Sequence, residues 1–209
     1  MGQKISRLQW LVEESEEQMA TQDSVTIPVH KPRLKEKLFF LLSGAIVSVP
    51  LTLFISQLSD YLFLSMPLIY ASILSVAVLA ALIEEFSKAY PLFYRHGETE
   101  RSLFVLGFLV GIGFGVVEFI EYVVFFKAPV FLRLPGIFFH ASTTSIMAFG
   151  IGKKKPTLFY LVAVSLHLVN NLLAVLGPIW YVGGTVVIGL AYFLSWYLYN
   201  RTVERTIPF

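Results

Sequence analysis

Residues 66–93 read MPLIYASILSVAVLAALIEEFSKAYPLF, an almost unbroken apolar run. It holds 28 residues with only three charged side chains, Glu84, Glu85 and Lys88. A transmembrane helix needs about 20 mainly apolar residues to cross about 30 Å of hydrocarbon. The stretch is therefore long enough to span a bilayer, and charged side chains are costly inside such a span.

Five further apolar runs of similar length surround this stretch, at residues 38–58, 103–126, 134–152, 156–177 and 179–199. Hydrophobic residues make up 56% of the 209-residue chain and charged residues 14%, against about 25% charged in average proteins. The mean hydropathy of +0.71 agrees with this excess. We therefore predict an all-α fold, a polytopic bundle of about six transmembrane helices, in a multi-pass integral protein of the cell membrane.

The runs predict three segments, at residues 1–37, 38–199 and 200–209. The first is polar, and the near-helical spacing of Ile5, Leu8 and Val12 favours a short amphipathic helix. The second holds the six spans, and the third is a tail. Basic residues near span ends are abundant on the side of the membrane that holds residues 1–37 and 200–209. The other side has two, Lys127 and Arg133. The positive-inside rule therefore predicts that residues 1–37 and 200–209 are cytoplasmic. The eleven basic residues on that side are Lys31, Arg33, Lys35, Lys37, Arg95, Arg101, Lys153, Lys154, Lys155, Arg201 and Arg205.

Composition also excludes several classes of function. A formal net charge of +2 gives no field that would attract nucleic acid, so we expect no nucleic-acid partner. The absence of cysteine removes disulfides, thiol nucleophiles and thiolate metal sites. The connections between spans are too short for a soluble catalytic domain, so any chemistry must use side chains within the membrane region.

Polar residues recur inside four consecutive spans, where each is a candidate functional group. Solvated helix ends alone do not explain such a series. The residues are Glu84, Glu85, Lys88, Glu118, Glu121, His140, His167, Asn170 and Asn171.

Helical spacing indicates which of these side chains share a face. Glu84 and Lys88, at i and i+4, can form an ion pair, whereas adjacent glutamates point about 100° apart. His167 and Asn171 also share a face. Gly107, Gly111 and Gly115 give span 103–126 a bare stripe for close helix packing. At about 1.5 Å per residue, Glu118 and His140 lie nearer the outer ends of their spans, so we expect the site to open outward.

Missing motifs narrow the chemistry further. The chain has no His-Glu-x-x-His motif and no Gly-x-Ser-x-Gly elbow, and its two aspartates, Asp23 and Asp60, lie outside the predicted spans. Glutamate and histidine remain. A carboxylate that accepts a proton from water, with polar groups that stabilise an oxyanion, is a sufficient set for amide hydrolysis.

Four segments resemble the ordered motifs of the PrsW-type glutamic intramembrane proteases, which are similar to the CAAX prenyl endopeptidase and bacteriocin-processing superfamily. They are Glu84-Glu85-Phe86-Ser87-Lys88, Phe114-Gly115-Val116-Val117-Glu118, His140 in Phe-Phe-His-Ala-Ser-Thr-Thr, and His167-Leu-Val-Asn-Asn171. The resemblance covers residues 66–177. Glu118 stands where the prenyl proteases have histidine, and Asn171 where the PrsW branch has aspartate.

The resemblance implies a catalytic set of Glu84, Glu85, Glu118, His140, His167 and Asn171. Glu84 would activate water, Glu85 would support it, and Glu118 would be the second group that holds the water. His167 and Asn171 would form the oxyanion site, and His140 would be an additional histidine of the branch. Residues 38–199 would then be the protease domain. Its substrate would be a membrane-anchored protein, cut on its outer side as anti-sigma factors are by relatives.

Several alternatives stay open at this point. Buried Glu and His also suit a small proton- or ion-coupled transporter, and a CAAX-type prenyl-protein endopeptidase lies within the same superfamily. A non-catalytic membrane scaffold is a third. We predict no resident cofactor, while a divalent metal held by Glu and His remains an alternative, as does any oligomeric state.

Overall fold

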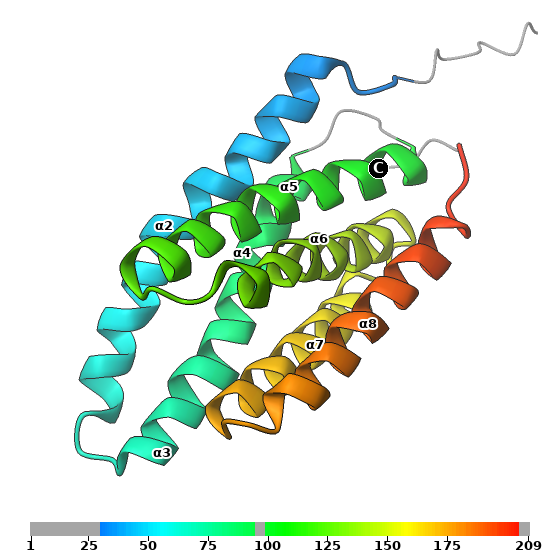
Figure 1. Cartoon of the computed structure of the whole chain (residues 1–209). Coiled ribbons are helices and arrows are strands. Elements are labelled where there is room, and N and C mark those ends of the chain that lie inside the picture. Colours follow the sequence, from blue (N-terminus) through cyan, green and yellow to red (C-terminus); the bar gives the residue numbers. More distant parts are fainter. Residues whose placement is uncertain (1–29, 95–98, 205–209) are drawn as a thin grey trace, which may run out of the picture.

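The computed structural model describes residues 30–94 and 99–204, and this part of the chain is helical apart from its connections (Figure 1). The predicted amphipathic helix within residues 1–37 falls almost wholly outside the described residues. The helices are α2 (Leu34–Phe63), α3 (Leu68–Ser72), η1 (Ile73–Leu79), α4 (Ala80–Phe93), α5 (Glu100–Ile120), η2 (Glu121–Phe125), α6 (Val130–Gly152), α7 (Pro156–Val175) and α8 (Trp180–Tyr199), where η marks π-helical segments.

Five helical stretches have the length and hydropathy of membrane spans: Leu68–Phe93, Glu100–Phe125, Val130–Gly152, Pro156–Val175 and Tyr181–Tyr199. They confirm the all-α membrane bundle, and each begins and ends within a few residues of a predicted run. The sixth predicted run, 38–58, lies inside the 30-residue helix α2, which is not among these five. The number of six spans and the cytoplasmic placement of the two ends therefore stay predictions.

Helix α6 is the centre of the bundle. All its residues from Phe139 to Gly152 are buried, and it packs between α5 on one side and α7 and α8 on the other. The glycine stripe of α5 faces it: a Cβ on Gly107, Gly111 or Gly115 would collide with atoms of α6. The predicted close helix contact is therefore confirmed, with α6 as the partner of α5.

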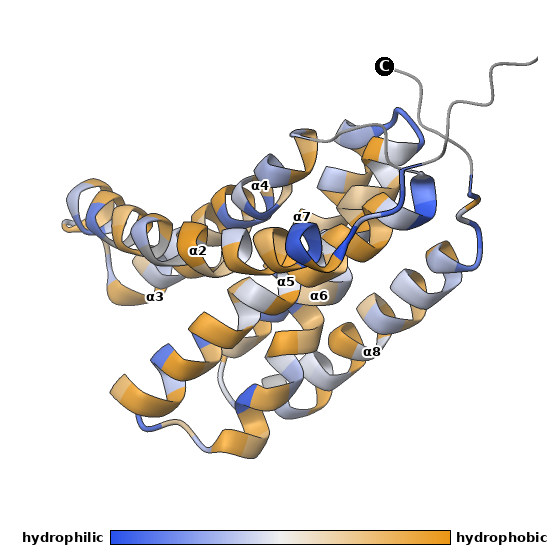
Figure 2. Ribbon diagram, turned by 90° about the horizontal axis from the view of Figure 1, so that it is seen from above, coloured by the Kyte–Doolittle hydropathy of each residue, from blue (hydrophilic) through white to orange (hydrophobic). Residues whose placement is uncertain are grey.

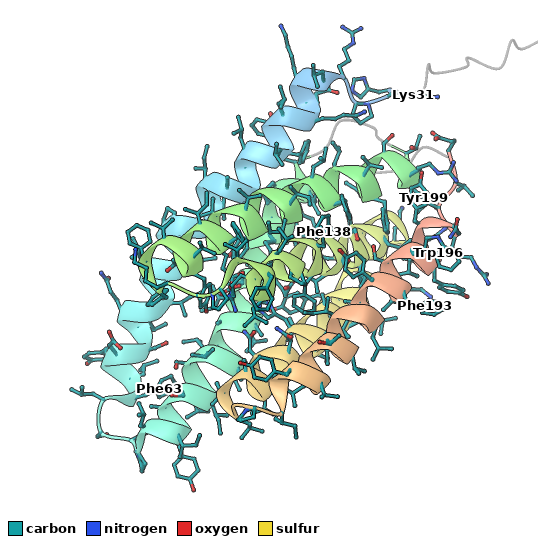
Figure 3. The ribbon with its side chains drawn as sticks, in the orientation of Figure 1. Lys31, Phe63, Phe138, Phe193, Trp196 and Tyr199 are labelled. Carbon is teal, nitrogen blue, oxygen red and sulfur yellow. The ribbon has the colours of Figure 1, made fainter. Side chains whose placement is uncertain are left out.

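Hydrophobic residues make up most of each helix, and hydrophilic residues gather at the end where α2 begins and α8 ends (Figure 2). Many of the large hydrophobic side chains are exposed on the bundle surface. Phe193 and Trp196, on the outward side of α8, are each 62% exposed (Figure 3). Such a surface suits contact with lipid rather than water. The opposite end of the bundle carries the α2–α3, η2–α6 and α7–α8 connections.

Candidate active site

A cavity of about 370 Å³ enters the bundle near the end opposite the start of α2 and the end of α8. Its walls come from α2, the two π-helical segments, α4, α5, α6, α7 and, through Ile188, α8. Five of the six predicted site residues line it: Glu84, Glu118, His140, His167 and Asn171. The structure thus brings together side chains from four helices that the sequence predicted only one helix at a time.

The close packing of α5 on α6 places Glu118 beside His140. Gly111 leaves no room for a side chain against the backbone of His140, so the two helices approach closely about two turns before Glu118. Oε2 of Glu118 contacts Nε2 of His140, and its Oε1 accepts a hydrogen bond from Nη2 of Arg133 at 3.3 Å. The Arg133 guanidinium lies 3.4 Å from the centre of the Tyr122 ring. Glu118 is therefore held between two nitrogen donors.

Glu85 lies behind the cavity wall and is linked to both histidines of the site, directly to His167 and through Lys88 to His140. Its Oε1 is 2.5 Å from Nζ of Lys88, 2.7 Å from Nδ1 of His167 and 3.1 Å from Oγ1 of Thr143. Nζ of Lys88 also lies 2.9 Å from Nδ1 of His140. Glu85 and Lys88 are both fully buried, so this is an ion pair within the bundle core.

The predicted pair of Glu84 with Lys88 is wrong, because Lys88 pairs with Glu85 instead. Spacing of i and i+3 also brings side chains together on a helix, and here α6 and α7 supply the remaining partners of that face. Lys88 is thereby directed to Glu85 and His140, and Glu84 faces the cavity.

Glu84 has a carboxylate oxygen, Oε2, that is buried and makes no hydrogen bond to the described residues. This oxygen lies 3.8 Å from Nε2 of His167. The distance is too long for a direct hydrogen bond, and a water to one side of the line between the two atoms can contact both. Because Nδ1 of His167 is bound to Glu85, the ring has a fixed orientation, with Nε2 toward Glu84.

The two asparagines of α7 complete one wall of the cavity. Nδ2 of Asn171 donates to the carbonyl of Val76 in η1 at 3.0 Å. Asn170 also lines the cavity, and within the described residues its Oδ1 is buried without a hydrogen-bond partner. The π-helical segment η1 thus takes part in the site through a backbone carbonyl, a common place for such irregular helices.

Some residues of the site were not among the sequence candidates, unlike Glu121, which also lines the cavity. Thr143 and Phe139 stand in the motif around His140 without an expected role, and Phe139 would be a lipid-facing or interfacial aromatic. In the structure the hydroxyl of Thr143 bonds to Glu85, and the buried Phe139 ring packs on His167 at 5.7 Å. Asp60, outside the predicted spans, is in α2 and lines the cavity, as does Arg133. Their roles depend on contacts between helices, which a single helical period does not reveal.

Glu84, His140 and His167 each offer one ligand atom within 4.8 Å of the others, which raises the question of a metal. A catalytic zinc site usually takes three protein ligands. Glu84 can offer an oxygen, and His167 has the carboxylate behind it that supports a metal-binding histidine. His140 fits poorly, because the ammonium of Lys88 can only donate to Nδ1, which leaves the ring proton on Nε2 toward Glu118. In this hydrogen-bond arrangement the three residues do not make a complete metal site.

Comparison with known proteins gives one match. A family model described as "PrsW family intramembrane metalloprotease" matches residues 33–198. No curated protein and no solved structure showed significant similarity to the chain. The matched residues make up most of the chain and include all the helices that line the cavity. The match agrees with the resemblance found in the motifs. This chain belongs to the PrsW family of intramembrane proteases.

Proposed function

We propose that the protein hydrolyses a peptide bond of a membrane-anchored protein with a water molecule activated by Glu84. The observation that carries this proposal is Oε2 of Glu84 in the cavity, which makes no hydrogen bond within the described part of the chain and lies 3.8 Å from Nε2 of His167. A water bound to both atoms from the cavity side would donate to the carboxylate and accept from the histidine. It would then be positioned for general-base catalysis.

The proposed reaction needs no group beyond the chain and the water. Glu84 takes a proton from the water as its oxygen adds to the carbonyl carbon of the substrate. The negative charge that develops on the carbonyl oxygen needs hydrogen-bond donors. The C–N bond then breaks, and the proton held by Glu84 passes to the departing nitrogen, which leaves as an amine.

His167 and Asn171 are the proposed oxyanion donors. Asn171 has two N–H groups, and the bond to the Val76 carbonyl uses one of them. His167 must carry a proton on both nitrogens for this role, one bound by Glu85 and the other facing the cavity. Glu118, between His140 and Arg133, would hold the water or the substrate from the α5 side.

We assign no step of the reaction to a metal ion, since His140 lacks a free lone pair in the arrangement described. The family description includes the word metalloprotease, so metal dependence requires a separate test by chelation. The substrate class that the motifs imply is a membrane-anchored regulator, such as an anti-sigma factor, cut on its outer side.

Co-expression tests the proposal directly. Candidate single-span membrane proteins are expressed with the wild type, with Glu84→Gln or with Glu121→Gln, and followed by immunoblot. Glu121 also lines the cavity and serves as the matched control. We expect a truncated product with the wild type and with Glu121→Gln, and its loss with Glu84→Gln at equal expression. Cleavage that persists in Glu84→Gln would refute the proposed base and favour the ion-coupled transporter.

A further inference from the structure

A second hollow lies beside the catalytic cavity, and we call it the loop groove. It has a volume of about 390 Å³ and is bounded by the connection before α6, the start of α6 and the turn between α7 and α8. Both connections are at the end of the bundle opposite the start of α2 and the end of α8. The residues that line it are Ala128, Pro129, Leu132, Arg133, Ala174, Gly177, Pro178 and Tyr181.

The loop groove adjoins the catalytic cavity. Leu132, Arg133 and Ala174 line both hollows. A substrate segment that reached from the cavity into the groove would pass these three side chains and would not have to cross a helix. An endopeptidase needs such a path, because its substrate continues on both sides of the bond that is cut.

The lining of the groove indicates what it would bind. Apart from Arg133, its walls are apolar or aromatic side chains, prolines and a glycine. An extended peptide alternates its side chains, so one apolar side chain can enter such a groove while its neighbours point away. Burial of that side chain would add binding energy next to the scissile bond.

Arg133 stands at the junction of the two hollows. Its guanidinium is fixed by stacking on Tyr122 at 3.4 Å and by the bond to Glu118 at 3.3 Å. A guanidinium carries five N–H donors, so a group fixed in this way can also donate to a peptide carbonyl that passes it. It would hold the backbone of the segment while the groove takes a side chain.

We propose that the loop groove binds an extended segment of the substrate beside the scissile bond and selects a large apolar side chain there. This proposal rests on the proposed function, since it names a specificity determinant of the same site. Ala174 is the residue to test, because it is exposed, lies in α7 and faces both hollows. A larger side chain there would fill the junction without displacing the core.

The test uses purified full-length protein in detergent and a set of synthetic peptides. Each peptide has an apolar span followed by an extended Ala/Ser segment in which a single Leu is moved one position at a time. We expect the wild type to cut one Leu position roughly tenfold faster than the others, the usual worth of a buried leucine side chain. Ala174→Phe should reduce this preference to about twofold. Val169→Phe, a substitution on the exposed face of the same helix, should keep it. An unchanged Leu preference in Ala174→Phe would overturn the proposal.

A second measurement separates this proposal from the proposed function. If the wild type cuts no peptide faster than Glu84→Gln does, the proposed function fails, and binding alone decides the role of the groove. A benzophenone side chain placed at Tyr181 in the Glu84→Gln protein should then cross-link to the peptide at its Leu, and less so when Ala174→Phe is added. The cross-linking sample also contains phospholipid added to the detergent, and cross-links that form only to this lipid would show that the groove holds an acyl chain and would overturn the proposal.

Discussion

The ion pair between Lys88 and Glu85 gives the sharpest prediction, which concerns stability. The Lys88→Met substitution keeps a long apolar side chain but leaves the carboxylate of Glu85 buried without its cation. Both side chains are inaccessible to solvent, and their atoms are 2.5 Å apart. Breaking a buried pair by removing one partner typically costs about 3–5 kcal/mol. We expect a loss of that size in the free energy of unfolding.

A second substitution should recover most of this loss. Replacing both partners of a buried pair by neutral groups of similar shape is often close to neutral. Lys88→Met with Glu85→Gln should therefore regain about half of the loss or more, while the bond between Thr143 and residue 85 can persist. Lys88→Met with Glu84→Gln is the matched control. It should regain little, because Glu84 faces the cavity and is not the partner of Lys88.

The assay is reversible unfolding of the purified protein in mixed micelles, with the free energy of unfolding obtained for the four proteins under identical conditions. Equal recovery with Glu84→Gln and Glu85→Gln would refute the assignment of the pair and restore the i, i+4 pair expected from spacing. A loss below about 1 kcal/mol in Lys88→Met would refute the buried charge itself, since exposed pairs contribute about that much or less.

Three further predictions concern the packing of α5 on α6, the hydrogen bond from Thr143 to Glu85 and the dependence of cleavage on a metal. Gly111→Ala should lower the free energy of unfolding by about 1–3 kcal/mol, because its Cβ would collide with the backbone of α6. Gly136→Ala, where a Cβ meets open space, should be neutral or slightly stabilising in the same unfolding assay. Thr143→Val should cost about 1.5–3 kcal/mol through the lost bond to the Glu85 carboxylate, and Thr144→Val, which loses only a bond to a backbone carbonyl, about 0.5–1.5 kcal/mol. EDTA treatment should leave peptide cleavage unchanged, whereas a loss that added Zn²⁺ restores would contradict the metal-free reaction.

The positions of the helices followed closely from the sequence because the bilayer imposes a length on every span. The apolar run 134–152 became α6, Val130–Gly152, and 156–177 became α7, Pro156–Val175. The glycine stripe of α5 also predicted a close helix contact correctly, since only glycine permits that approach. The identity of the partner helix was not predictable, because hydrophobic periodicity carries no information about which neighbour fills a bare stripe.

Only those site residues whose side chains are costly to place inside a membrane span were predictable from the sequence. Glu84, Glu118 and His167 stood out because ionisable groups are rare inside spans. Thr143 did not, because a threonine in a membrane helix usually satisfies itself on a carbonyl of its own helix, as the hydroxyl of Thr144 does here. Its bond to Glu85 depends on the distance between α4 and α6. The pairing of Lys88 with Glu85 was missed for the same reason, because side chains of α6 and α7 also contact these two residues.

The contrast between the two adjacent glutamates follows from the geometry of one helix. Glu85 is directed toward α6 and α7, where Lys88, Thr143 and His167 compensate its charge. Glu84, about 100° farther round the helix axis, cannot reach the same partners and faces the cavity. The first carboxylate can therefore fix the ring of His167 only because its charge is compensated within the bundle. The second lies 3.8 Å from Nε2 of that ring, too far for a direct hydrogen bond, and it keeps an oxygen available for a proton.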